Sequence, residues 1–174
     1  MKKIIIVLIG IVLTSTTFFS GCIGDGNGRL VLQITDAPGD LNISEALVTI
    51  SNIEVHRAVG GKNNTTAEWE IIVDEPQTFD LVEIRDVKEF LGSKNLSVGV
   101  YTQIRLHIDE ASAIIDEVQY ELEIPSSTIK LVKGFKIDTE ETITLTLDFD
   151  VNESIHKTGS NNYIFQPTIV VIQE

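Results

Sequence analysis

The sequence predicts an all-β protein, an antiparallel β-sandwich with one short helix. Between residues 29 and 172, apolar and polar residues alternate in runs that turn residues separate, which is the pattern of half-buried strands. About eight to ten such runs recur at regular spacing, and this is typical of a sandwich. The expected arrangement is of the immunoglobulin or transthyretin kind, with Greek-key connections.

Four strands are expected in the first half of the chain, at 30–34, 46–57, 68–73 and 78–82. The first ends at the turn 35–40, where Asp, Pro and Gly each favour a bend. The alternation in the second changes phase near Ser51, which predicts a β-bulge. Trp69 alternates with Ile71 and Val73, so it is expected in the core.

One segment has a different period. Ile84, Val87 and Leu91 recur at the spacing of one helix face, and Gly92 follows as a stop signal. We therefore expect the single short helix near 84–91.

Six further strands are expected at 100–108, 118–124, 129–132, 135–137, 142–150 and 163–172. In the first of these, Tyr101 and Arg105 alternate with Ile104 and Leu106, so they are expected on the face turned away from the core. Pro167 predicts an edge position or a bulge in the last strand.

Residues 1–22 have the layout of a lipoprotein signal. Lys2 and Lys3 give a positive start, the run 4–19 carries no charge, and Gly21 precedes Cys22, the only cysteine. The uncharged run is shorter than the ~18–20 residues that span a bilayer. We expect residues 1–21 to be a signal peptide that is removed, and Cys22 to carry the lipid. The protein would then be extracytoplasmic and anchored to the cell membrane.

Composition limits the partners and the number of domains. The chain has 26 acidic and 13 basic residues, a net charge of −13, so nucleic acid would repel it. Residues 22–28 are expected to be the lipidated cysteine and a flexible tether, and 29–174 a single domain. A lone cysteine allows no disulfide within the chain, so the core must stabilise the fold unaided.

Three blocks of sequence are similar to a known family. They are L-Q-I-T-D-A-P at 32–38, G-V-Y-T-Q-I-R-L at 99–106 and L-T-L-D-F-D at 145–150, followed by Pro167. In this order they resemble the uncharacterised domain of bacterial and archaeal envelope lipoproteins that begins with a strand and a T-D-A-P turn. The resemblance implies a secreted, lipid-anchored β-domain, and it carries over no activity.

Calcium is the one metal that the acidic residues suggest. Asp36 and Asp40 flank the first turn, and Asp148 and Asp150 share the non-core face at a strand end. Calcium prefers several carboxylate and carbonyl oxygens from loops. If the two strand ends meet, these four carboxylates would converge. The alternative is that Asp36 caps its own turn and that Asp148 and Asp150 lie on a solvated strand face.

Arg105 has a structural interpretation. It lies mid-strand between Ile104 and Leu106, and an ion pair inside the domain, with Asp36 as the first candidate and Asp148 as the second, would satisfy its charge.

Catalytic motifs are not evident. There is no G-x-S-x-G nucleophile motif, and His56, His107 and His156 are far apart in sequence. Zinc would need cysteines or closely spaced histidines. We expect no enzymatic activity and no cofactor other than calcium.

Candidate glycosylation sites are the Asn-x-Ser/Thr sequons, which lie in expected turns or element ends: Asn42, Asn63, Asn64, Asn95 and Asn152. The alternative is hydroxyl-rich turn chemistry.

The sequence thus favours a lipid-anchored surface domain that binds, adheres or scaffolds an envelope assembly, with an envelope protein or surface ligand as partner. A calcium-dependent recognition module is the second hypothesis, and an envelope hydrolase with a dispersed site is the third.

Overall fold

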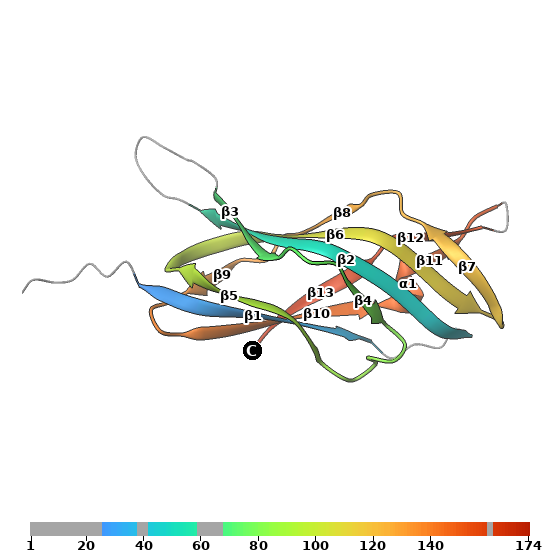
Figure 1. Cartoon of the computed structure of the whole chain (residues 1–174), viewed down its shortest axis with the longest axis horizontal. Coiled ribbons are helices and arrows are strands. Elements are labelled where there is room, and N and C mark those ends of the chain that lie inside the picture. The colour runs from blue at the N-terminus through green and yellow to red at the C-terminus, as the bar shows by residue number, and fades with distance from the viewer. Residues whose placement is uncertain (1–25, 38–41, 59–67, 160–161) are drawn as a thin grey trace, which may run out of the picture.

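A computed structural model describes residues 26–37, 42–58, 68–159 and 162–174, and Figure 1 shows two layers of strands. The layers are a four-stranded and a nine-stranded sheet. The prediction of an all-β sandwich is therefore confirmed. We call the face of each sheet that is turned away from the other sheet its outer face.

The four-stranded sheet has the order β13-β10-β1-β5. Its strands are β1 (Asn27–Asp36), β5 (Glu89–Ser97), β10 (Thr142–Asp150) and β13 (Thr168–Gln173). β1 and β10 pair in parallel, whereas β5 and β13 pair antiparallel with their neighbours. β12 and β7 also pair in parallel, so the expectation of a purely antiparallel sandwich is wrong.

The nine-stranded sheet is built around two long paired strands, β2 (Ile43–Ala58) and β6 (Gly99–Ile115). The order along its main path is β11-β12-β7-β6-β2-β3. β4 also pairs with β2, and β8 and β9 with β6. The remaining bounds are β3 (Glu68–Val73), β4 (Gln77–Asp80), β7 (Val118–Glu123), β8 (Thr128–Leu131), β9 (Phe135–Ile137), β11 (Ile155–Lys157) and β12 (Tyr163–Phe165).

The core lies between the sheets and is made by alternate residues of the long strands. Fully buried examples are Leu30, Leu32 and Ile34 of β1, Leu145, Leu147 and Phe149 of β10, Ile50, Ile53 and Val55 of β2, and Ile104, Leu106 and Ile108 of β6. Burying each such side chain contributes ~1.5–3 kcal/mol, so the domain has a substantial core without a disulfide.

The helix expected near 84–91 does not form. Residues 81–86 form turns, and β5 begins at Glu89. Ile84 and Leu91 are both buried, but one belongs to the turns and the other to the strand, so their helical spacing is coincidental. The helix of the described chain is the four-residue α1 (Val151–Ser154).

β-Bulges reverse two expected side-chain orientations. β6 gains an extra residue at Thr102, since Arg57 faces Tyr101 while His56 faces Gln103. Tyr101 is therefore fully buried and stacks on Phe135 at 5.1 Å between ring centroids.

A second bulge turns Trp69 from its expected place in the core to the outer face. β3 gains an extra residue at Ile72, because Ile53 faces Val73 while Glu54 faces Ile71. Val73 is buried, but Ile71 is 48% exposed and Trp69 is half-buried on the outer face. The prediction of a core tryptophan is therefore wrong.

In the described part of the chain, none of the helices has the length and apolar character needed to cross a membrane.

Candidate functional site

The parallel pairing of β1 and β10 brings their carboxyl ends together, as the sequence-based hypothesis required. Asp36 is the last residue of β1 and lies opposite Phe149 of β10. Its side chain is completely buried. One carboxylate oxygen, Oδ1, accepts a hydrogen bond from the Val151 N–H at 2.9 Å, and Oδ2 accepts one from Arg85 Nε at 3.3 Å. Asp36 thus ties β1 to the start of α1 and to the turn before β5.

Burial raises the pKa of Asp36 from 3.8 to about 6. The hydrogen bond from Val151 and the contact with Arg85 lower this pKa, and the charge of Asp150 raises it again. The pKa of Asp148 is also raised, first by burial and then by the charges of Asp150 and Asp86. The carboxyl cluster is therefore one in which ionisation is costly.

This cluster is organised by contacts within the protein. Both oxygens of Asp36 are engaged, and Asp150 caps α1 by accepting a hydrogen bond from the Glu153 N–H at 3.0 Å. Asp148 lies half-buried on the outer face, and Asp40 falls outside the described residues. Within the described ranges, no group of three or more His, Cys, Asp or Glu side chains is placed to hold a metal ion.

Arg105 does not pair with Asp36, because the two residues belong to different sheets. It projects from the outer face of the nine-stranded sheet, where Arg105 Nη1 lies 3.3 Å from Glu54 Oε1 of the neighbouring strand. Its guanidinium carbon lies 3.7 Å from the centroid of a Trp69 ring. Arg85, 49 residues beyond Asp36, is the partner instead. The ion pair that Arg105 does make, with Glu54, lies partly exposed on the outer face rather than inside the domain.

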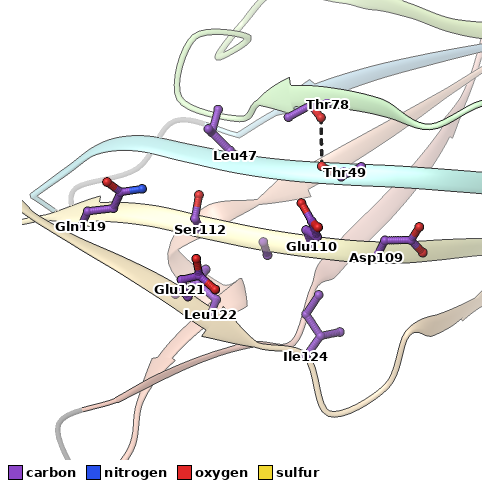
Figure 2. Close-up of a pocket in the computed structure, with 11 residues that line it drawn as sticks. Leu47, Thr49, Thr78, Asp109, Glu110, Ser112, Gln119, Glu121, Leu122 and Ile124 are labelled. Carbon is purple, nitrogen blue, oxygen red and sulfur yellow. Dashed lines mark hydrogen bonds between the residues drawn. The ribbon is translucent and has the colours of Figure 1, made fainter.

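A second site was not predicted: an open hollow on the outer face of the nine-stranded sheet, with a volume of about 550 Å³. We call it the acidic hollow. Strands β2, β4, β6 and β7 surround it in Figure 2. Its lining residues are Leu47, Thr49, Thr78, Asp109, Glu110, Ala111, Ser112, Gln119, Glu121, Leu122 and Ile124.

The acidic hollow is polar and carries one sign of charge. Asp109, Glu110 and Glu121 line it, and the lining includes no Lys, Arg or His. Thr49 and Thr78 share a hydrogen bond of 2.9 Å between their hydroxyls, drawn in Figure 2. Buried Ala111 and Leu122 also line it. Such a surface can accept hydrogen bonds and attract cationic groups.

The acidic hollow lies away from the amino-terminal end of the domain. Gly28 of β1 packs near Ile137, which pairs with Gly99 at the start of β6. Asp109–Ser112 lie far along the same strand, and Figure 1 shows β7 at the opposite end from the first residues of β1.

Comparison with known proteins identifies a family for this chain. Residues 27–167 match a protein family described as a domain of unknown function, DUF4382. The chain belongs to this family. No curated protein and no solved structure matches. The match supports the predicted membership of an uncharacterised family, and the lipoprotein setting that the resemblance implied stays a prediction.

Two of the three histidines of this DUF4382 domain have hydroxyl hydrogen-bonding partners. His56 Nδ1 lies 2.8 Å from the Thr102 hydroxyl, and His107 Nδ1 lies 3.2 Å from that of Thr128. His156 is exposed on β11. These three do not form a common site.

The sequons of the DUF4382 domain have different environments. Asn42 donates a hydrogen bond from Nδ2 to Asp116 Oδ1 at 3.1 Å. Asn95 is exposed on β5, and Asn152 is half-buried in α1. Asn63 and Asn64 lie outside the described residues. The use of these sequons stays a prediction.

One signal in the sequence pointed toward the acidic hollow. Two consecutive acidic residues, Asp109 and Glu110, follow the expected strand 100–108 directly. In the DUF4382 domain a bulge lies at this point, because Thr49 faces Glu110 while Ile50 faces Ile108. β6 continues beyond it to Ile115, and the bulge turns two consecutive carboxylates outward.

Proposed function

We propose that this chain is a lipid-anchored domain of the cell surface that acts by binding rather than by catalysis, with the acidic hollow as its ligand surface. The observation that carries the proposal is the lining of this hollow, which has three carboxylates and no basic side chain. A ligand that neutralises these carboxylates would be cationic. We therefore propose a lysine- or arginine-rich segment of an envelope partner.

The position of the acidic hollow suits a surface-anchored receptor. Lipid on Cys22 would attach the chain five residues before β1 begins at Asn27, a tether of at most ~18 Å. The amino-terminal end of the domain would then stay close to the membrane. The hollow, toward the other end of β6, would remain accessible to a partner.

The chemistry of the lining favours binding over hydrolysis. The lining includes one serine, Ser112, but no histidine that could act as its general base. Asp109 already accepts a hydrogen bond of 2.7 Å from the Ser51 hydroxyl. The hydroxyls of Thr49 and Thr78, which share a hydrogen bond, and the carboxylates of the lining supply donors and acceptors for a ligand.

Lipid anchoring is tested by fractionating cells that produce the full chain or its Cys22→Ser variant. We expect the parent protein in the membrane fraction, with an intact mass that lacks residues 1–21 and includes a lipid. The variant should lose the lipid and the cleavage coupled to it. An intact mass with Met1 retained and Cys22 unmodified would refute the anchoring.

Ligand binding is tested with a fluorescent octalysine peptide at about 0.15 M salt, where exposed charges more than ~8 Å apart are largely screened. Changing Glu110 and Glu121 to Gln should weaken the Kd at least about tenfold, or ~1.4 kcal/mol. The control changes Glu140 and Glu141 to Gln, which alters the net charge equally in an exposed turn near β1.

The control variant should bind octalysine within about twofold of the parent, because its charges are farther than a Debye length from the acidic hollow. Equal weakening of both variants would show that the peptide senses only the net charge of −13, and the acidic hollow would then not be the ligand surface.

A further inference from the structure

β13 is an edge strand with an unused set of backbone hydrogen-bonding groups. Within the described residues it pairs only with β10. Glu174 N–H donates to the Thr144 carbonyl at 3.0 Å, and such bonds alternate along antiparallel strands. The even-numbered residues of β13 therefore direct their backbone groups to β10. The odd-numbered residues Ile169, Val171 and Gln173 direct theirs to the free side.

The side chains of β13 do not protect this edge. Its sequence, T-I-V-V-I-Q, contains no charge, proline or glycine. On the outer face, Val170 is 60% and Ile172 41% exposed. Natural sheets usually protect an edge with lysines, bulges or a very short strand, and β13 has none of these.

The other sheet edges do have such protection. β5 carries Glu89 and Lys94 and has a bulge against β1. β3 carries Glu68 and Glu70. β11 is only three residues long and includes a lysine. The strands β4, β8 and β9, each of which pairs with a single neighbour, also carry a charged residue. Among the described strands that pair on one side only, β13 alone is uncharged, in a chain whose net charge is −13.

We propose that β13 pairs with β13 of a second copy of this chain, antiparallel and centred on Val171. This register places Val171 opposite itself and Ile169 opposite Gln173. Each free N–H and C=O of these residues then has a partner in the other copy. The two four-stranded sheets merge into one continuous sheet.

The same register is supported by the side chains. Directly opposite residues in an antiparallel pair project to the same face. Val170 of one copy therefore meets Ile172 of the other on the outer face, on both sides of the two-fold axis. A shift by one residue would place outer-face side chains opposite core-facing ones, which a half-buried sheet does not tolerate.

The partner that fits this edge best is another uncharged strand, and β13 of a second copy is one. An acidic strand of another protein, or the acidic surface elsewhere on this chain, fits the edge less well. Because β13 is uncharged, two copies can approach here without bringing carboxylates of the strand together. The acidic hollow belongs to the other sheet, so the dimer leaves both hollows uncovered. This inference is independent of the proposed function.

Sedimentation velocity of the mature chain carrying Cys22→Ser, over a micromolar concentration series, tests the dimer. We expect a concentration-dependent monomer–dimer equilibrium. The variant V170K/I172K should weaken dimerisation at least about tenfold, because like charges then face each other across the pair. Both positions are exposed, so the thermal midpoint should stay close to that of the parent.

A charge-swapped variant tests the register. In V170K/I172E, lysine of one copy faces glutamate of the other, so dimerisation should recover to within a few-fold of the parent. A parent that stays monomeric throughout the series would overturn the proposal. Dimerisation unaffected by V170K/I172K would place the interface elsewhere, and failure of V170K/I172E to recover would overturn the register centred on Val171.

Discussion

The environment of the buried Asp36 carboxyl group is formed by three separate parts of the fold. Asp36 belongs to the T-D-A-P turn, accepts a hydrogen bond from the backbone of α1 and pairs with Arg85 from the turns before β5. The ion pair is imperfect, because Arg85 Nη2 is buried without a hydrogen-bond partner among the described residues. Burial of Asp36 outweighs the attraction to Arg85, so its pKa rises.

The pH dependence of stability follows from this pKa. Asp36 titrates at about 6 in the folded protein, against an ordinary value of 3.8, so the folded state binds the proton more tightly. The resulting stabilisation is complete below about pH 4 and is lost as the pH rises through 6. Relative to Asp36→Asn, the free energy of unfolding of the parent should fall by roughly 2 kcal/mol between pH 4 and 7.

Urea unfolding of both proteins across this pH range would measure the difference. Asp148, whose pKa is also raised, is present in both proteins, so most of its contribution cancels. A difference that increases with pH would contradict the prediction, and would show that the charged pair with Arg85 outweighs the cost of burying Asp36.

At the scale of elements, period-two alternation predicted most strands correctly. The expected strands 68–73, 135–137 and 142–150 coincide with β3, β9 and β10. Alternation succeeds in β9 and β10 because each of these strands has one face toward the core. The single strand expected at 163–172 is instead divided around Pro167 into β12 and β13, which belong to different sheets. β13 does lie at a sheet edge, as the proline predicted.

The errors at this scale have two physical causes. Bulges at Ile72 and Thr102 insert one residue and thereby exchange the faces of Trp69 and Tyr101. The bulge predicted near Ser51 from the change of phase is confirmed, but no such signal marks the other two. The segment expected as a helix failed because its apolar residues are buried by different elements. Local period cannot distinguish such a turn–strand junction from a helix face.

The candidate sites depend on long-range order that no local pattern contains. The sequence raised the hypothesis that Asp36 and Asp150 lie close together, because each ends a strand. It did not predict the parallel pairing of β1 with β10 that brings them together. Arg85 could not be identified as the partner, because it belongs to a segment whose structure was predicted wrongly. The acidic hollow requires β4, β2, β6 and β7 to lie side by side, and sheet order is not evident from the sequence.

At the scale of the whole molecule, the negative charge attracts cations generally, but this does not create a metal site. A calcium site needs several converging oxygen ligands. Of the four aspartates that suggested one, Asp36 has both oxygens engaged, and Asp150 caps α1. Breaking these contacts would cost part of the stabilisation that metal binding supplies.

We therefore expect calcium to leave the fold unaffected. The thermal midpoint of residues 23–174 should shift by less than about 1 °C between a chelator and 5 mM calcium, whereas a ligand at 100 times its Kd adds ~2.7 kcal/mol. Magnesium at the same concentration controls for screening of the net charge. An upward shift of several degrees with calcium alone, abolished by changing Asp148 and Asp150 to Asn, would contradict this. It would mean that Asp148 and Asp150 contribute to a calcium site.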